Sequence, residues 1–292
     1  MQKRKFWGWG YQDQVLSDEE DAAIESLIAA HFSLDEVPNL PIPLAEDIDL
    51  PTPRVNIPRT LEKVLSEDHL ERLNHSYGKS FPDLARAMLK QFPHPPDLVA
   101  FPEDQEDVVN ILDWSDQNNI AVIPYGGGSS VCGGVETYVG EDYSGVISLD
   151  LRNLDKVLEI DKESRAARIQ AGIFGPALEN ELRKYDLTLR HFPQSFEHST
   201  LGGWIATRSG GHFATLYTHI DDFVESTTMV TPTGVIESRR LPGSGAGPSP
   251  DRMVIGSEGI LGVITEAWMR LQDRPIFRSS CSVEFDDYQK AL

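Results

Sequence analysis

The chain has 292 residues, of which 40% are hydrophobic and 25% are charged, a composition typical of a globular protein and not of a disordered one. Its formal net charge of −20 argues against a nucleic-acid partner, because duplex binding depends on neutralising phosphates with a basic face, and it disfavours broad docking on anionic lipid. A local basic pocket is compatible with this charge, and the length suits two small domains or one large domain with an appendage.

The cysteines and the N-terminus bear on the compartment. Cys132 and Cys281 lie far apart without metal-ligand spacing, which is typical of a reducing compartment. No apolar run reaches the length of a membrane span, and the first residues lack the apolar core of a signal peptide. We therefore expect a cytoplasmic protein without a transmembrane segment. His212 and His219 have no third ligand at useful spacing, so no metal site is expected.

Residues 1–93 are predicted to form a helical N-terminal arm. An aromatic stretch around two glycines comes first, and Ser17 with Glu20 then makes a capping box for a helix. Apolar residues follow at helical spacing, namely Ile24, Leu27, Ile28 and Phe32. A proline-rich connector is expected after this helix, and two shorter helices are predicted over 61–73 and 81–91.

Residues 94–275 predict an α+β domain. Its helices are expected over 103–118 and 175–184. A hairpin is expected around Thr231–Gly234, with glycine at the turn. The strands are expected over 97–102, 120–124, 143–151, 157–160, 166–171, 226–230, 235–238 and 262–271. After Pro275 a new segment begins, and residues 279–285 are expected to open a strand.

A glycine loop follows the apolar run that ends at Pro124. Five glycines stand within the nine residues from Gly126 to Gly134, and Ser129 and Ser130 add small hydroxyl donors. Glycine allows a positive φ and close backbone approach, so such a loop can turn its N–H groups inward as an anion-binding nest. The natural ligand is a phosphate or a pyrophosphate. The alternative is a tight strand connection, because glycine clusters also occur in ordinary loops.

The amino-acid sequence of this loop disfavours two common kinds of nucleotide-binding site. It contains no lysine, so it is not the phosphate loop of nucleoside triphosphate hydrolases. Val131 stands where the third glycine of Gly-x-Gly-x-x-Gly belongs, and no long amphipathic helix follows as the Rossmann pattern requires. A different dinucleotide fold is needed.

Four stretches together resemble the flavin-binding domain of the p-cresol methylhydroxylase and vanillyl-alcohol oxidase superfamily. They are Pro124–Val131 (Pro-Tyr-Gly-Gly-Gly-Ser-Ser-Val), Pro193–Gly203 (Pro-Gln-Ser-Phe-Glu-His-Ser-Thr-Leu-Gly-Gly), Thr207–Gly211 (Thr-Arg-Ser-Gly-Gly) and Ile255–Thr265 (Ile-Gly-Ser-Glu-Gly-Ile-Leu-Gly-Val-Ile-Thr). In that fold, FAD lies between two α+β subdomains with its pyrophosphate on the glycine loop. The resemblance covers roughly residues 94–275 and implies the same fold and cofactor here.

Further details are similar to the alkyldihydroxyacetonephosphate synthase family. They are the arm Phe6-Trp-Gly-Trp-Gly-Tyr11, the triplet Gly202-Gly203-Trp204 with Thr207-Arg208, and Asp221-Asp-Phe-Val with Met229-Val-Thr-Pro-Thr-Gly-Val235. Flavin-linked lactate and glycolate dehydrogenases share the glycine loop and the Gly-Ser-Glu-Gly turn, but they usually carry Gly-Gly-Asn-x-x-x-Asn-x-Gly-Gly. This chain has Gly-Gly-Trp-Ile-Ala-Thr-Arg-Ser-Gly-Gly there, which favours the ether-lipid family.

The resemblance implies which residues contact FAD. The loop gives Pro124, Tyr125, Gly126, Gly127, Gly128, Ser129, Ser130 and Val131. The later stretches give Gln194, Ser195, His198, Ser199, Thr200, Gly203, Thr207, Arg208, Ser209, Gly210, Gly256, Ser257, Glu258, Gly259, Ile260, Gly262 and Val263. The loop contains no histidine, so non-covalent FAD is expected. His191 matches a histidine of the family's active site, although Arg190 and Phe192 replace the expected glycine and acidic neighbours.

Three functions remain open at this stage. The first is the family's exchange of the acyl group of acyl-dihydroxyacetone phosphate for a fatty alcohol in ether lipid synthesis. The second is an FAD-linked 2-hydroxy acid dehydrogenase or oxidase. The third is a non-catalytic flavin-binding fragment, because the family's substrate-binding cap lies downstream and residues 276–292 are expected to be only its start. The resemblance also implies a small-molecule or lipid substrate. Peripheral membrane contact and a homodimer are further expectations that the sequence leaves open.

Overall fold

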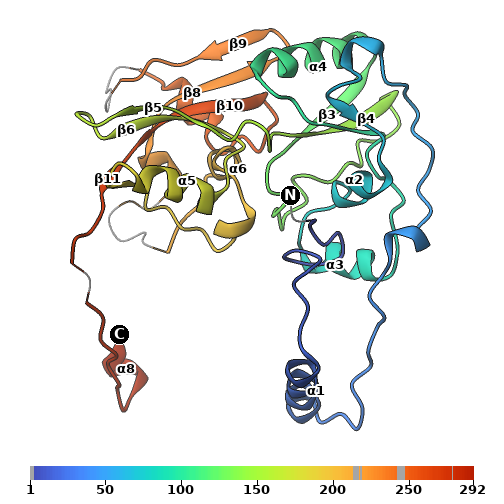
Figure 1. Ribbon diagram of the computed structural model, residues 1–292, viewed down its shortest axis with the longest axis vertical. Coiled ribbons are helices and arrows are strands. Elements are labelled where there is room, and N and C mark those ends of the chain that lie inside the picture. Colours follow the sequence, from blue (N-terminus) through green and yellow to red (C-terminus); the bar gives the residue numbers. More distant parts are fainter. Residues whose placement is uncertain (1–2, 213–216, 218, 242–246, 278) are drawn as a thin grey trace.

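The first sheet is built around a parallel strand–helix–strand unit. The computed structural model describes residues 3–212, 217, 219–241, 247–277 and 279–292, and it has the expected mixture of helices and sheets (Figure 1). Strands β2 (Leu98–Ala100), β3 (Ile120–Tyr125) and β4 (Gly145–Asp150) are parallel, with β4 in the middle and α4 (Gln105–Gln117) between β2 and β3 in the chain.

The carboxyl ends of these strands lie at the edge where the glycine loop begins. The register pairs Tyr125, the last residue of β3, with Asp150, the last residue of β4. Every residue of β4 is buried, as expected for the central strand of a parallel sheet. Ligands bind at such carboxyl ends in open α/β sheets, so the fold places the glycine loop where a cofactor is expected.

The second sheet is antiparallel and has the strand order β5-β6-β10-β8-β9. The predicted hairpin is confirmed, because Thr231 pairs with Gly234, whose φ is +132°. Helices α5 (Gly175–Arg183) and α6 (Leu201–Ala206) lie beside one face of this sheet (Figure 1). The strands are β5 Val157–Asp161, β6 Ala166–Gln170, β8 Val224–Thr231, β9 Gly234–Glu237 and β10 Val263–Arg270.

Short elements connect these sheets. Strands β7 (Leu187–Thr188) and β11 (Gln272–Asp273) pair with each other. The other short elements are η1 Ala45–Asp47, η2 Arg59–Leu61, η3 Phe196–His198, η4 Ile220–Asp222, α7 Pro250–Val254 and α8 Tyr288–Ala291.

Both sheets share one hydrophobic core. Leu98 and Ile147 from the first sheet belong to the same buried cluster as Ile169 and Met269 from the second. A smaller cluster packs the N-terminal residues onto the first half of the chain, with Phe6 buried against Leu73, Tyr77, Ala87 and Phe92. The arm that begins the chain is therefore anchored by apolar burial.

The helix expected over 61–73 is wrong. The structure has β1 (Leu65–Ser66), which pairs antiparallel with β2, followed by a short helix α2 (His69–Asn74) that Asp68 caps. Sheet pairing wins because it satisfies backbone groups at the edge of β2 while Leu65 stays buried. The predicted domain boundary after residue 93 remains a prediction. Strand β1 precedes this boundary in the sequence but belongs to the same sheet as β2, β3 and β4, which follow it.

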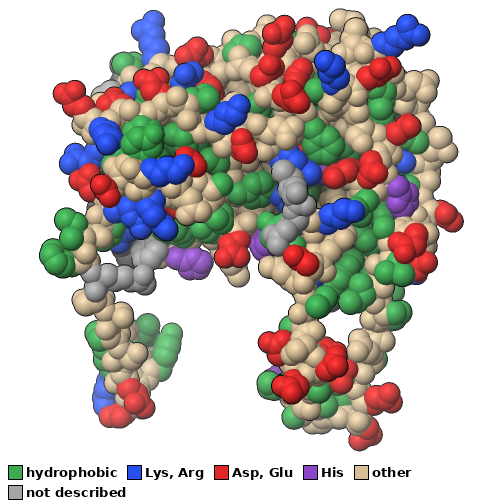
Figure 2. Space-filling model, in the orientation of Figure 1, with side chains coloured by type: hydrophobic (Ala, Val, Ile, Leu, Met, Phe, Trp, Pro, Cys, Tyr) green, Lys and Arg blue, Asp and Glu red, His purple; other side chains and the backbone are tan. Residues whose placement is uncertain are grey.

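The predicted helix after Ser17 is confirmed as α1 (Asp18–Phe32), and the helix expected over 81–91 is present as α3 (Phe81–Met88). No residue of α1 is buried, and Figure 2 shows acidic and apolar side chains together around it. The strand expected over 279–285 is absent among the described residues 279–292, where Val283 and Phe285 are exposed. An unpaired segment has no ladder to join. Within the described ranges, no helix combines the length and apolar composition needed to cross a bilayer.

Candidate cofactor site

A cavity of about 380 Å³ lies where the glycine loop leaves β3, and all four predicted stretches line it. Its wall combines the loop with residues of α6 and of the turn before β10. The predicted contact residues that line it are Pro124, Tyr125, Gly126, Gly127, Gly128, Ser129, Ser130, Val131, Ser195, Ser199, Thr200, Gly203, Thr207, Ser209, Glu258, Gly259 and Gly262. Residues more than 130 positions apart in the sequence are thus brought together around one space.

The other predicted residues lie outside this lining. They are Gln194, His198, Arg208, Gly210, Gly256, Ser257, Ile260, Val263 and His191. The sequence also missed lining residues, most of them apolar or small: Cys132, Gly134, Val135, Leu151, Pro193, Gly202, Trp204, Ala206 and Ile264. Pro193, Gly202 and Ile264 lie within the stretches that carry the resemblance. The position of Leu151, directly after the central parallel strand, is a further signal for a lining residue.

Glycine is required in the loop by close packing. A Cβ on Gly126 would overlap the Thr200 hydroxyl, and a Cβ on Gly127 would overlap the carbonyl of His198. Gly128 has a φ of +66°, and a Cβ there would overlap the Tyr125 hydroxyl. The loop is therefore pressed against residues 198–200 on one side and against the end of β3 on the other.

The polar groups of the loop are distributed unequally. Among the described residues, the backbone N–H groups of residues 126–131 have no protein acceptor, although these residues line the cavity. The carbonyl groups of Gly127 and Ser130, in contrast, accept hydrogen bonds from Arg4 and Lys79. A row of unpaired donors in a glycine-rich loop fits an anion, and the absence of Cβ atoms allows close approach. These residues fit the diphosphate of a dinucleotide.

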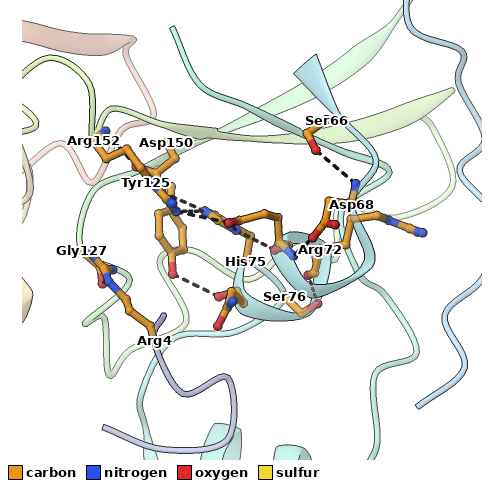
Figure 3. Close-up of polar contacts among 12 residues, drawn as sticks. Arg4, Ser66, Asp68, Arg72, His75, Ser76, Tyr125, Gly127, Asp150 and Arg152 are labelled. Atoms are coloured by element: carbon orange, nitrogen blue, oxygen red, sulfur yellow. Dashed lines mark hydrogen bonds and ion pairs between the residues drawn. The ribbon is translucent and has the colours of Figure 1, made fainter. Parts of the chain in front are cut away.

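A buried ionic network lies next to Tyr125, the last residue before the loop (Figure 3). Asp150 accepts hydrogen bonds from His75 Nε2 at 2.9 Å and from Arg152 Nη2 at 2.6 Å. Burial alone would raise the pKa of Asp150, but the hydrogen bond from His75 and the charge of Arg152 hold it below its ordinary value. The ring of Tyr125 lies 4.3 Å from that of His75, and burial raises the pKa of Tyr125 to about 12. The last residue before the loop is therefore fixed and neutral.

Comparison with known proteins identifies this kind of site. Residues 96–238 match the family of FAD binding domains. Over 252 residues the chain is 41% identical to an alkyldihydroxyacetonephosphate synthase of Dictyostelium discoideum, which covers 84% of this chain and 40% of the relative. A solved structure of an alkyldihydroxyacetonephosphate synthase aligns with a TM-score of 0.84 at 34% identity, over 94% of this chain and 55% of the other. The chain is an alkyldihydroxyacetonephosphate synthase-like member of the FAD-binding family.

The relationship extends more weakly to redox enzymes. The mitochondrial D-lactate dehydrogenase (cytochrome) of Arabidopsis thaliana is 33% identical over 217 residues, which are 74% of this chain and 36% of that protein. The chain spans about 40% of the length of the Dictyostelium relative. The family and the fold are therefore established for this synthase-like chain.

The hydroxyls of the second predicted stretch build the wall of the synthase-like site. Thr200 caps α6, and Ser199 accepts a hydrogen bond from Trp204 Nε1 at 2.7 Å while it donates to the carbonyl of Ser195. Ser199 and Thr200 are both almost fully buried. These side chains hold the indole of Trp204 against the cavity, so their clearest role is to shape it.

The Gly-Ser-Glu-Gly turn is tied to the other end of α6. The backbone N–H of Gly256 bonds to the carbonyl of Ile205, and that of Glu258 bonds to the carbonyl of Ala206. Gly256 and Gly259 have φ values of +83° and +82°, which favour glycine. Glu258 and Gly259 reach the cavity. The Ser257 hydroxyl is buried without a hydrogen-bond partner among the described residues.

His191 lies behind the cavity. It is 3% exposed and packs against the rings of Trp204 and Phe223. Its Nε2 lies 2.8 Å from the hydroxyl of Ser209, which lines the cavity. Burial, helped by the nearby His219, lowers the pKa of His191 to about 4, so the ring is neutral at pH 7. Its catalytic role stays a prediction, and any action on a ligand passes through Ser209.

Proposed function

We propose that the cavity holds FAD non-covalently, with the diphosphate at the glycine loop. The observation that carries this proposal is the row of unpaired N–H groups from Gly126 to Val131 in a match to FAD binding domains. The absence of histidine from the loop supports non-covalent attachment, while Cys132 is exposed at the cavity and offers the alternative of a covalent link.

We further propose that the complete protein exchanges the acyl group of an acyl-dihydroxyacetone phosphate for a fatty alcohol. Bound FAD would supply the ring at which this exchange proceeds without net oxidation. The similarity to alkyldihydroxyacetonephosphate synthases supports this reaction over oxidation of a 2-hydroxy acid. The chain's Gly-Gly-Trp-Ile-Ala-Thr-Arg-Ser-Gly-Gly segment also favours it.

The roles of this chain's own residues follow from their positions. The glycine loop binds the anionic part of the cofactor, and Trp204 with Ile264 makes an apolar wall that limits water. Ser209 lines the cavity, and its hydroxyl shares a hydrogen bond with the neutral His191. This pair can orient a ligand oxygen or hold a proton at the Ser209 oxygen.

The first experiment is a visible absorption spectrum of the gel-filtered protein, before and after acid precipitation. Free FAD in the supernatant is the expected result. Colour that stays with the pellet would show a covalent link and direct attention to Cys132. A folded but colourless protein that takes up no added FAD would refute the proposal.

The reaction is tested separately on the complete protein. Labelled fatty alcohol is expected to appear in an ether product when acyl-dihydroxyacetone phosphate is present, and no product would refute the exchange. Bleaching of the flavin by lactate or glycolate without air would instead support the 2-hydroxy acid alternative. Any turnover by residues 1–292 alone would exclude the non-catalytic alternative.

We also propose a cytoplasmic homodimer that contacts membranes peripherally to reach lipid substrates. The similarity to alkyldihydroxyacetonephosphate synthases, together with the proposed lipid substrates, supports the membrane contact. Sedimentation of the purified protein tests the dimer, and co-sedimentation with neutral lipid vesicles tests the contact.

A further inference from the structure

The N-terminal residues cross the outer side of the glycine loop. Arg4 donates a hydrogen bond from Nη1 to the carbonyl of Gly127 at 2.6 Å, and its guanidinium lies over the ring of Phe174 at 4.7 Å (Figure 3). Backbone bonds between Lys5 and Gly10 fold residues 3–12 back on themselves, and Phe6 is buried in the smaller core cluster. The position of Arg4 is thus fixed by packing on both sides.

Lys79 holds the same part of the loop from a different segment. Its backbone N–H bonds to the carbonyl of Ser130 at 2.6 Å, and its Nζ donates to the carbonyl of Lys5 at 3.0 Å. Burial and then the charge of Arg4 lower the pKa of Lys79 to about 8, so the ammonium is still charged at pH 7. Lys79 therefore connects the N-terminal residues to the loop.

The charges of these two cations are not cancelled by an ion pair. Among the described residues, no carboxylate lies within salt-bridge distance of Arg4 or Lys79, and Asp83 is paired with Arg86. Their field reaches His198, whose carbonyl packs against Gly127 of the loop. Burial lowers the pKa of His198, and the charges of Arg4 and Lys79 lower it further, against the opposing charge of Glu197.

Arg4 and Lys79 supply positive charge next to a loop that contains no lysine. The loop contains no lysine and the chain carries a net charge of −20, yet a diphosphate needs positive charge nearby. Arg4 and Lys79 bind the carbonyl side of the loop and leave its N–H groups for the cavity. We propose that Arg4 and Lys79 are the counter-charge that holds the FAD diphosphate on the glycine loop. This inference rests on the proposed FAD site and extends it to residues outside the matched domain.

The test separates charge from simple bracing by comparing two flavins. Riboflavin has the same ring system as FAD but lacks the diphosphate. Arg4→Gln and Lys79→Gln each remove a charge and keep a hydrogen-bond donor. Dissociation constants of FAD and riboflavin for the flavin-free protein are measured by quenching of flavin fluorescence. We expect each variant to bind FAD about tenfold more weakly and riboflavin within about twofold of the unchanged protein, because only the diphosphate carries the charge.

Lys5→Gln is the matched control. It removes the same charge from the same stretch, but the Lys5 side chain bonds to the carbonyl of Gln14 and not to the loop. Its FAD affinity is expected to stay within about twofold of the unchanged protein, since an exposed charge away from the site is screened by salt. An equal loss for Lys5→Gln and Lys79→Gln would show a general effect of net charge and overturn the proposal.

The remaining outcomes also decide the matter. Equal weakening of FAD and riboflavin in Arg4→Gln or Lys79→Gln would show that these residues only brace the loop. If the variants do not fold, the salt dependence of the unchanged protein replaces them: FAD affinity must fall with salt while riboflavin affinity stays flat. The proposed function fails in a different way, because the unchanged protein would then bind neither flavin.

Discussion

Removal of the charge of Asp150 is expected to destabilise the fold strongly. Asp150 is fully buried, and its Oδ2 accepts from His75 Nε2 and from Arg152 Nε and Nη2, at 2.9, 2.8 and 2.6 Å. Its Oδ1 accepts the backbone N–H of Arg152 at 2.9 Å. Asparagine offers one oxygen in place of two, so Asp150→Asn turns an amide group toward at least one buried donor.

The magnitude follows from the burial of the partners. Loss of one member of a buried ion pair costs about 3–5 kcal/mol, because the remaining charge is left uncompensated. Arg152 has 19% of its side chain exposed and also lies 3.4 Å from Glu71, so part of its charge remains solvated and paired. We therefore expect Asp150→Asn to lower the free energy of unfolding by about 3 kcal/mol, at the lower end of that range.

Urea unfolding at pH 7, followed by tryptophan fluorescence, measures this change. The control is Asp47→Asn, which breaks an ion pair with Lys90 whose side chains are 48% and 41% exposed. That variant is expected to lose at most about 1 kcal/mol. A loss below about 1 kcal/mol for Asp150→Asn would refute the reasoning that this network is a buried charged support.

The difference in unfolding free energy between the unchanged protein and Asp150→Asn should decrease at acidic pH. The pKa of Asp150 is lower in the fold than its ordinary value of 3.8. The unfolded chain therefore takes up the proton first as the pH falls, and the stability that Asp150 contributes is present above about pH 4 and lost below it. A difference in unfolding free energy between the two proteins that stays constant from pH 7 to pH 3 would contradict the ionised state of Asp150.

Three further predictions concern the loop, His191 and the domain boundary. Gly127→Ala should abolish FAD uptake and cost about 1–3 kcal/mol of stability, because the added Cβ would overlap the backbone of residues 198 and 199. The control is Gly8→Ala, whose added Cβ would have its nearest atom 3.8 Å away and which should retain FAD. Equal visible absorption spectra of the two variants would contradict this prediction. Folding lowers the pKa of His191 from 6.5 to about 4, so between these pH values the unfolded chain binds a proton that the folded chain does not. The unchanged protein should therefore lose stability as the pH falls from 6.5 to about 4. Urea unfolding should show a smaller loss in His191→Gln. A fragment that begins at residue 94 lacks β1 and exposes the edge of β2, so size exclusion should show aggregation; a folded monomer would support the boundary predicted after residue 93.

The local parts of the site could be predicted from the sequence. Each of the four glycine-containing stretches has a characteristic local sequence, and each contributes to the lining of one cavity. Helices α4 and α5 and the strands of the two larger sheets in residues 94–275 have clear periodicity or turn signals, and α4 and the β8–β9 hairpin were predicted with bounds within two residues of those observed. The short helices α6 and α7 and the β7–β11 pair were not predicted. In these segments the local pattern and the global fold agree.

Long-range contacts could not be predicted in this way. Arg4 is 123 positions from Gly127, and His75 is 75 positions from Asp150. No local periodicity encodes such pairs. The strand β1 has two residues, and its leucine also fits the helical spacing of the residues around it, so only the exposed edge of β2 decides its conformation. The contact between His191 and Ser209 could not be predicted either, because Ser209 belongs to a separate stretch 18 positions later in the sequence.

The contacts missed by the sequence explain how an acidic chain can present a site for an anion. The loop is held on the carbonyl side by Arg4 and Lys79, and on the strand side by Tyr125, whose ring packs on His75 of the His75–Asp150 pair. The backbone N–H donors of residues 126–131 have no protein acceptor among the described residues and belong to residues that line the cavity. The protein therefore bears the cost of arranging them when it folds and not when the ligand binds. The net charge of −20 belongs to the chain as a whole, and charges are screened beyond about 10 Å at ordinary salt, whereas Arg4 and Lys79 lie directly behind the loop.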